Sequence, residues 1–223
     1  MTKEIIKLSG PEAAPTSGKK AKQLVIFLHG LGANGDDLFG LASFFSETMP
    51  DAHFVSPNAP FPCDMAPVGF QWFSLQDRTE SAVLEGVRKA EPILNNFIDE
   101  KKAELGLDDK DVYLVGFSQG TMLSIHTALR RAKPLGGVLG YSGALVGAHL
   151  IKDECKSKPE ICLIHGEADD VVPFDAFSQA MSVLQKQGFK VHGYSAPDIG
   201  HGIDPAGMQI GIKFLRDMFK QEA

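Results

Sequence analysis

Residues 112–131 read VYLVGFSQGTMLSIHTALRR and decide the fold class of this chain. The apolar run VYLV leads directly into Gly-Phe-Ser-Gln-Gly, and a helical pattern of apolar residues begins directly afterwards. A serine at such a strand-to-helix turn has a strained backbone, and the glycines two places before and after it let the neighbouring chain pass. We therefore predict that Ser118 is an exposed nucleophile at the N-terminus of a helix, where the helix dipole favours negative charge.

Ser142, in the sequence GYSGA after the next apolar run, is the alternative candidate for this turn. It lacks the second glycine, and the sequence ALVGAHL that follows it is a poorer helical pattern. The local sequence therefore favours Ser118 over Ser142.

Short apolar runs alternate with longer helical patterns along the whole chain, which is typical of βα units around a mostly parallel sheet. The predicted strands cover residues 24–28, 52–55, 112–117, 137–141, 161–164 and 189–194. The predicted helices cover residues 36–49, 79–105, 119–131, 173–187 and 205–220, and Pro92 is expected to kink or split the second of them. This pattern predicts an α/β fold, with a twisted sheet and helices on both faces.

The 223 residues, 43% of them hydrophobic, suit one α/β domain spanning residues 1–223, whose first 20 residues are expected to form an N-terminal strand and loop. The segment 57–75, PNAPFPCDMAPVGFQWFSL, contains four prolines and has no regular period, so it is predicted to be a long loop. No large lid domain is expected between the strands, which predicts a site that is open to the surface.

Composition excludes several classes of partner and cofactor. The net charge of -6 offers no basic surface for nucleic acid or anionic lipid. The spacing of Cys63, Cys155 and Cys162 matches no zinc or redox motif, so free thiols and no metal site are expected. The first residues contain no apolar run of signal-peptide length, and no 18-residue apolar stretch occurs. We therefore expect a cytoplasmic protein without stable membrane insertion.

A nucleophilic serine needs a histidine base and a carboxylate that orients the imidazole. In folds with this serine turn, the acid and then the histidine follow the serine along the chain. His201, in a loop after the last predicted strand, is the predicted base because such a loop reaches the carboxyl edge of the sheet. In ICLIHGEADDVVP, Asp169 is the predicted acid and Asp170 the alternative, whereas Glu167 is interpreted as a turn residue.

The remaining histidines after Ser118 are set aside because of their positions. His126 and His192 fall inside a predicted helix and a predicted strand. His149 and His165 precede the acidic cluster, which the chain order places before the base. His201 is therefore the remaining candidate for the base.

The sequence HGLGANGDD, residues 29–37, follows the first strong strand and is rich in residues with a permissive backbone. We predict that the backbone amides of Leu31 and Gln119 bind the oxyanion of the tetrahedral intermediate. His29 is expected to orient this loop and not to transfer protons.

The sequence GFQWFSL, residues 69–75, places the only tryptophan between two phenylalanines. One hypothesis is that Trp72 and Phe73 line an acyl-binding wall together with Leu31 and Val172. The alternative is that the two aromatic side chains pin the long loop to the core.

The motifs FLHGLG, PNAP, QWF, GFSQG, HGEADDVVP and GHGI occur in one order, and over residues 25–215 the chain resembles the phospholipase/carboxylesterase family of small α/β-hydrolases. That family includes acyl-protein thioesterases and bacterial carboxylesterases. The resemblance implies an α/β-hydrolase fold, a triad of Ser118, Asp169 and His201, and an oxyanion hole at the Leu31 and Gln119 amides. It also implies hydrolysis without a cofactor, often by homodimers.

Two positions depart from the family pattern. Glu167 stands where the family usually has aspartate, and Ser74 stands where the tryptophan motif often continues into aspartate. Neither position belongs to the triad, but the second bears on substrate preference.

We therefore predict an enzyme that cleaves carboxylic esters or thioesters through an acyl-enzyme on Ser118. Its expected substrates are small acyl esters, lysophospholipids or acylated proteins. The alternative hypothesis is a small-molecule binding protein that retains the triad but has negligible turnover. A dienelactone-type hydrolase is disfavoured because it normally has cysteine in place of Ser118.

Overall fold

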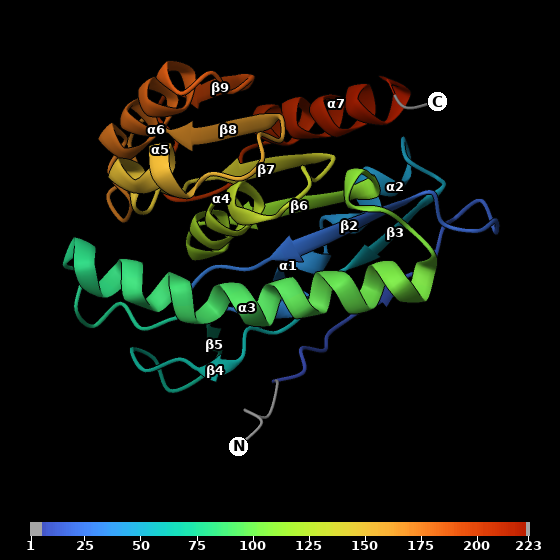
Figure 1. The fold of residues 1–223 in the computed structure, drawn as a ribbon, viewed down its shortest axis with the longest axis horizontal. Helices are drawn as coiled ribbons and strands as arrows, with labels where there is room; N and C mark the ends of the chain where they lie inside the picture. Colours follow the sequence, from blue (N-terminus) through green and yellow to red (C-terminus); the bar gives the residue numbers. More distant parts are fainter. Residues whose placement is uncertain (1–5, 222–223) are drawn as a thin grey trace.

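The computed structural model describes residues 6–221, and a twisted seven-stranded sheet organises them (Figure 1). The strand order is β1-β3-β2-β6-β7-β8-β9, and only β1 runs antiparallel to its neighbour. The predicted mostly parallel sheet is thus confirmed. The strands are β1 (Glu12–Ala13), β2 (Gln23–Leu28), β3 (Ala52–Val55), β6 (Val112–Phe117), β7 (Gly137–Tyr141), β8 (Ile161–Gly166) and β9 (Val191–Ala196).

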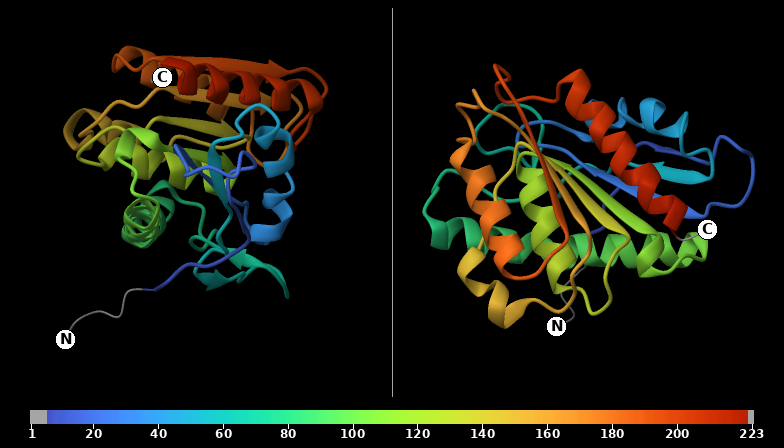
Figure 2. Two further views of the ribbon diagram at one scale, coloured as in Figure 1. Left: turned by 90° about the vertical axis from the view of Figure 1, so that its right-hand side faces the viewer. Right: turned by 90° about the horizontal axis from the view of Figure 1, so that it is seen from above.

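Helices cover both faces of this sheet (Figure 2), as the alternating pattern predicts. One core cluster packs α3, α4, α5 and α6 against one face, and the other packs α1, α2 and α7 against the opposite face. The helices are α1 (Gly35–Phe39), α2 (Ala42–Ser46), α3 (Glu80–Leu105), α4 (Gln119–Arg130), α5 (Ile151–Glu154), α6 (Asp175–Lys186) and α7 (Pro205–Gln221), with short 3₁₀ turns at Asp109–Asp111 and Ala148–Leu150. No helix among the described residues is long and apolar enough to span a bilayer.

The long helix α3 begins and ends at residues suited to those positions. The Thr79 side chain caps its N-terminus by accepting a hydrogen bond from the Ala82 amide, and Gly106 ends it in the left-handed conformation. Pro92 lies inside α3 but does not split it, so that part of the prediction is wrong. The helix continues because buried side chains before and after Pro92, including Val87 and Leu94, pack on one core.

The predicted single helix over residues 36–49 is wrong, because the structure has two short helices there. Asn34 and Asp37 form a reciprocal capping box that starts α1. At Gly40, a residue with low helix propensity, the helical ladder is interrupted, and the Leu41 amide bonds instead to the Leu38 carbonyl three residues back. The second helix, α2, then begins at Ala42.

Two further predictions need correction. The segment 57–75 is not wholly a loop, because β4 (Phe61–Pro62) and β5 (Phe70–Gln71) pair as a small antiparallel hairpin. The last strand begins at Val191 instead of Phe189, because the Phe189 amide bonds back to the Leu184 carbonyl and still belongs to the end of α6. Gly188, with a φ of 76°, permits that tight ending.

The chain order of the strands reverses between β2 and β6, which are neighbours in the sheet. Leu28 at the end of β2 pairs with Gly116 near the end of β6. The loops that follow these two strands therefore meet at the carboxyl edge, and such a switch point is where open α/β sheets bind ligands.

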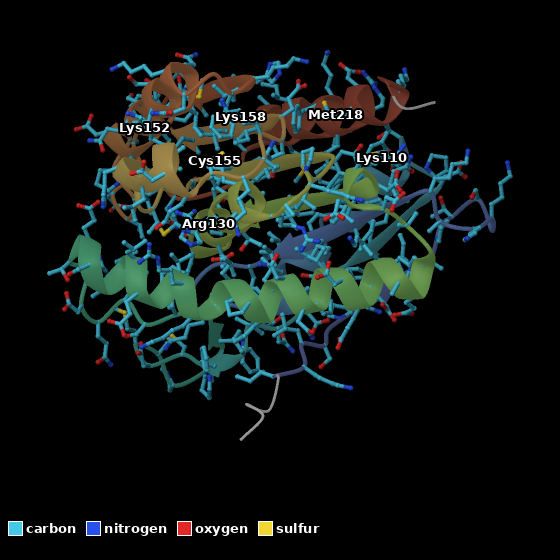
Figure 3. All side chains as sticks on the ribbon, viewed as in Figure 1. Lys110, Arg130, Lys152, Cys155, Lys158 and Met218 are labelled. Carbon is cyan, nitrogen blue, oxygen red and sulfur yellow. The ribbon has the colours of Figure 1, made fainter. Side chains whose placement is uncertain are left out.

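The segment after β7 also lies at this edge, and ion pairs to α3 and α4 fix its position. Arg130, at the end of α4 and labelled in Figure 3, donates from Nε and Nη2 to Glu154 Oε2 of α5, at 2.9 and 2.6 Å. Arg88 of α3 also pairs with Glu154. These contacts tie the segment between β7 and β8 to the two helices beneath it.

Candidate active site

Ser118 lies at a strained turn between β6 and α4. Its φ and ψ are 54° and −116°, a conformation that non-glycine residues rarely adopt. A Cβ at Gly120 would lie 1.8 Å from the Leu28 carbonyl oxygen, and a Cβ at Gly116 would lie 2.5 Å from the Thr121 amide nitrogen. Both flanking positions therefore require glycine, because α4 packs directly against the sheet there.

The structure brings Ser118, His201 and Asp169 together from three different loops. His201 Nε2 is 3.0 Å from Ser118 Oγ, and His201 Nδ1 is 2.7 Å from Asp169 Oδ2. Because an ionised carboxylate only accepts hydrogen bonds, Nδ1–H donates to Asp169, and Nε2 is left to accept from the serine hydroxyl. Ser118 is buried at 8% exposure, so the predicted exposed position is wrong, although the residue lines a cavity described below, and the Asp169 side chain is fully buried.

Three donors keep the buried Asp169 carboxylate ionised. Burial by itself raises the pKa of Asp169, but the hydrogen bonds from His201 and from two backbone amides outweigh it and hold the pKa below its usual value. The amides are those of Val171 and Val172, each 2.9 Å from Oδ1. The turn after β8 thus presents one carboxylate oxygen to its own backbone and the other to His201.

His165, at the end of β8, is a second histidine next to Asp169, and sequence reasoning missed it. Its Nε2 is 2.8 Å from the Val172 carbonyl oxygen and 3.3 Å from Asp169 Oδ2. The side chain is buried and lies against the rings of Phe174 and Phe177. His165 therefore braces the turn that carries Asp169. The signal was its position four residues before Asp169, but the order rule had set it aside as a base.

The alternative residues are placed elsewhere. Asp170 is exposed, and Glu167 is exposed and accepts a hydrogen bond from Ser195 Oγ at 2.6 Å. Ser142 is buried and also has a positive φ of 48°, but its hydroxyl donates to the Gly202 carbonyl oxygen at 3.4 Å. The side-chain contacts of the His201 imidazole nitrogens are therefore with Ser118 and Asp169, and not with these alternative residues.

Leu31 lies on the loop after β2, and Gln119 is the first residue of α4, so their backbone amides meet at the switch point. Within residues 6–221, neither amide donates a hydrogen bond to another group of the protein. Two unpaired donors beside a serine suit an oxyanion that forms there during the reaction. Gly30 brings the first loop close, since a Cβ built on it would lie 3.4 Å from the Ser118 Cβ.

His29 orients this loop, as its position after β2 predicts. Its Nδ1 donates to the Gly30 carbonyl oxygen at 2.7 Å, and its Nε2 accepts from the Ala59 amide at 3.0 Å. Burial lowers the pKa of His29, and the bond to Gly30 offsets this only in part. The imidazole is therefore neutral at pH 7 and acts as a structural link.

The segment directly after the β4–β5 hairpin contacts both the loop after β2 and the start of α4. The Trp72 indole donates to the His29 carbonyl oxygen at 3.0 Å. The Gln119 side chain accepts from the Trp72 amide and donates to the Phe73 carbonyl oxygen, both at 2.8 Å. One aromatic segment thus connects the loop that carries Leu31 to the residue after Ser118.

A cavity of about 630 Å³ opens beside Ser118 on the face covered by α3, α4 and α6. Its lining is mostly apolar and includes Leu31, Leu75, Val83, Met122, Leu145, Val146, Val172 and Ala176, together with Ser118 and His201. The exposed Glu80 lies at its rim, where it contacts His149 Nδ1 at 3.0 Å. We call this the acyl-side cavity.

Of the four residues predicted to form an acyl wall, only Leu31 and Val172 line this cavity. Trp72 and Phe73 do not, because they are buried at 0% and 3% exposure and pack in the core beneath the hairpin. Sequence reasoning missed the segment 144–148, which looked like a poor helix and instead lines the cavity as a loop and turn. It also missed Val83 and Met122, which fall inside predicted helices and line the cavity.

The sheet, its switch point and the side chains gathered there define this protein as an α/β-hydrolase. Residues 12–219 match the model of the phospholipase/carboxylesterase family, and the chain belongs to that family. Its structure superposes on the crystal structure of esterase PE8 with a TM-score of 0.92 and 39% identity, covering 96% of this chain and 100% of the other.

Two relatives agree with this placement. Esterase YpfH from Escherichia coli K12 is 28% identical over 198 residues, which cover 89% of this chain and 84% of the relative. Acyl-protein thioesterase 1 from Candida albicans is 26% identical over 223 residues, which cover 93% of this chain and 96% of the relative. The predicted family and the predicted class of enzyme, a carboxylesterase or acyl thioesterase, are confirmed at this level.

Proposed function

We propose that this chain is a serine hydrolase that cleaves carboxylic esters or thioesters through an acyl-enzyme on Ser118. The observation that carries the proposal is the continuous line from Ser118 Oγ through His201 to Asp169, with contacts of 3.0 and 2.7 Å. This line ends at the mouth of an apolar cavity large enough for an acyl chain.

In the proposed mechanism, His201 Nε2 takes the proton of Ser118 Oγ as that oxygen attacks the carbonyl carbon. The negative charge that develops on the carbonyl oxygen is bound by the amides of Leu31 and Gln119. The imidazolium, stabilised by the ionised Asp169, then gives its proton to the departing alcohol or thiol. His201 then deprotonates a water molecule, which attacks the acyl carbonyl carbon. The bond between that carbon and Ser118 Oγ breaks, His201 returns the proton to Oγ, and the carboxylic acid leaves.

The substrate is proposed to place its acyl chain in the acyl-side cavity against Leu31 and Val172. The names of the relatives support both ester and thioester substrates. A lysophospholipid is a further candidate, because it is also a monoacyl ester with a flexible chain that can enter an open cavity. Small acyl esters and acylated proteins are the other members of this class.

The test is a rate series on p-nitrophenyl esters from acetyl to palmitoyl, with palmitoyl-CoA as the thioester. A burst of nitrophenolate equal to the enzyme concentration is expected wherever hydrolysis of the acyl-enzyme limits turnover. A fluorophosphonate probe should label the peptide that carries Ser118, and mass spectrometry identifies the labelled residue. Ser142→Ala should be labelled like wild type, whereas Ser118→Ala should not.

The outcome decides between the two hypotheses for this chain. Turnover with labelling at Ser118 supports the hydrolase. A folded wild-type protein that is inert on the whole series and unlabelled by the probe contradicts it, and the binding-protein hypothesis then takes its place.

A further inference from the structure

A second cavity lies at the same edge of the sheet but on the opposite face, where α1, α2 and α7 pack. Its volume is about 330 Å³, roughly half that of the acyl-side cavity. Its apolar lining comes from Ala33, Leu38, Leu41, Phe117 and Ile203. Two cavities therefore flank the carboxyl edge of the sheet, one on each face, and Ser118 stands at that edge.

The two cavities meet at the proposed reaction centre. Gly30 and Phe117 line both of them. The Phe117 ring lies 4.9 Å from the imidazole of His201, measured between ring centroids. A Cβ at Gly30 would lie 3.1 Å from the Phe117 ring and 3.4 Å from the Ser118 Cβ, so a side chain at this position would crowd both residues.

An ester or thioester has two arms that leave its carbonyl carbon in different directions, the acyl chain and the alcohol or thiol. We propose that the second cavity binds the leaving-group arm while the acyl chain occupies the acyl-side cavity, an inference that rests on the proposed function. When the bond between Ser118 Oγ and the carbonyl carbon forms, the bond to the leaving oxygen or sulfur breaks. The proton that His201 took from Ser118 passes to that atom, and the alcohol or thiol departs through the second cavity.

The lining of the second cavity indicates which leaving groups it binds. Its apolar walls suit a hydrocarbon group next to the scissile bond. Its one acidic residue is the exposed Asp37, whose Oδ2 accepts a hydrogen bond from the Asn34 amide. The carboxylate attracts cationic leaving groups and repels anionic ones. The leaving groups expected to bind in the second cavity are therefore bulky apolar or cationic alcohols and thiols.

The experiment compares leaving groups on one common acyl chain. Methyl, 3,3-dimethylbutyl and choline butyrates all form the same butyryl-enzyme, so differences in kcat/KM report the step in which the leaving group departs. Choline is the cationic counterpart of 3,3-dimethylbutanol and has nearly the same shape. A parallel series of methyl esters from acetate to octanoate measures acyl preference separately.

Two cavity-filling variants separate the arms. Leu41→Trp fills the second cavity and should lower kcat/KM for 3,3-dimethylbutyl butyrate by about tenfold relative to methyl butyrate, with acyl preference unchanged. Val83→Trp fills the acyl-side cavity and should shift acyl preference toward short chains, with the leaving-group ratio unchanged. Circular dichroism confirms that each variant is folded.

A charge variant gives a second readout that does not depend on cavity filling. Wild type should favour choline butyrate over 3,3-dimethylbutyl butyrate, and Asp37→Asn should reduce that ratio about two- to fivefold, the range expected for an exposed charge. Glu80→Gln removes a carboxylate at the rim of the acyl-side cavity and should leave the ratio unchanged.

The outcomes for the two proposals are distinct. If wild type hydrolyses these esters but neither Leu41→Trp nor Asp37→Asn changes leaving-group preference, the second cavity does not bind the leaving group and the inference is overturned. If wild type hydrolyses none of them, the proposed function itself fails, and the inference fails with it.

Discussion

Ser118 and Ser142 stand at equivalent places on two neighbouring strands. Each follows a buried parallel strand, has a glycine two residues before it and adopts a positive φ, 54° for Ser118 and 48° for Ser142. Each amide extends the sheet pairing by one bond, to the Tyr141 and Ile164 carbonyl oxygens at 2.9 and 2.8 Å. Their hydroxyls differ: that of Ser118 faces His201 Nε2, whereas that of Ser142 donates to the Gly202 carbonyl oxygen.

The difference arises from the segment that follows each serine. After Ser118 the helix α4 begins at once, so the turn is sharp and the hydroxyl faces the acyl-side cavity. After Ser142 the chain continues as a loop, and the hydroxyl supports the backbone next to His201. A positive φ after a parallel strand therefore does not identify a nucleophile, because the partner of the hydroxyl decides its role.

The largest effect should come from deleting each hydroxyl in turn. Ser118→Ala should lower kcat by at least about 10⁴-fold, because no acyl-enzyme can form. Ser142→Ala should lower kcat by less than about tenfold, because it removes only one support of the His201 loop. Steady-state rates on p-nitrophenyl butyrate measure both. A loss in Ser142→Ala as large as that in Ser118→Ala would contradict the assignment.

The next effect concerns Asp169, the acid that contacts His201 in the series Ser118–His201–Asp169 and has no counterpart at Ser142. Asp169→Asn should lower kcat by about 10³- to 10⁴-fold, because an amide no longer holds the imidazole in the tautomer that accepts the serine proton. Asp170→Asn is the matched control at the adjacent, exposed position, and its kcat should stay within about twofold of wild type. Equal losses in the two variants would show that the acid is wrongly assigned.

Stability should show the strain at Ser118 once the loss of its hydroxyl is matched. Ser118→Gly and Ser118→Ala both lose the hydroxyl contact with His201, but only glycine relieves the strained φ, which is worth about 1 to 3 kcal/mol against about 0.4 to 1 kcal/mol for the added freedom of the unfolded chain. The unfolding free energy of Ser118→Gly should therefore be about 1 kcal/mol above that of Ser118→Ala. Ser142→Ala should lose about 1 kcal/mol relative to wild type, because it removes a buried hydrogen bond. Urea denaturation measures all three variants, and a Ser118→Gly variant no more stable than Ser118→Ala would argue against strain at the turn.

The smallest effect is a pH dependence of the unfolding free energy that arises from Asp169 and has no counterpart at Ser142. The pKa of Asp169 lies below its usual value in the folded state, so its ionised form stabilises the fold. This contribution is fully present above the unfolded-state pKa of about 4 and is lost as the pH falls through the folded-state pKa. The difference in unfolding free energy between wild type and Asp169→Asn should therefore shrink as the pH falls below about 4.

Urea denaturation at several pH values tests this dependence. The difference between wild type and Ser142→Ala is the control and should stay constant over the same range, because the bond from Ser142 ends on a carbonyl oxygen that does not titrate. A constant difference for Asp169→Asn would show that its carboxylate gains nothing from its donors.

Local patterns predicted the elements well where one chain segment decides the outcome. The run 112–117 became β6 with the predicted bounds, because both faces of a central parallel strand are buried and apolar residues are continuous. Prediction failed where an element end depends on a backbone bond, as at Gly40, where the ladder is interrupted, and at Phe189, whose amide bonds back to α6. Such bonds leave no trace in hydrophobic periodicity.

For the candidate site, the sequence predicted side chains whose loops follow strands and missed those that line the cavities from elsewhere. Ser118, Asp169 and His201 each follow a strand of one parallel sheet, so their meeting at its carboxyl edge was predictable. Trp72 looked like part of a binding wall, but its indole bonds to the His29 carbonyl oxygen in the core. The local sequence around an aromatic residue in a loop is the same whether its side chain lines a binding site or packs in the core.

By itself, the sequence determined the α/β fold class and the strand-to-helix turn at Ser118, because glycine spacing and apolar runs act over a few neighbouring residues. Only the tertiary structure decided that His165 braces Asp169, that Trp72 connects the loop after β2 to Gln119, and that cavities lie on both faces of the sheet. Those features depend on distances between segments far apart in the chain, and such distances exist only after the helices have packed on the sheet.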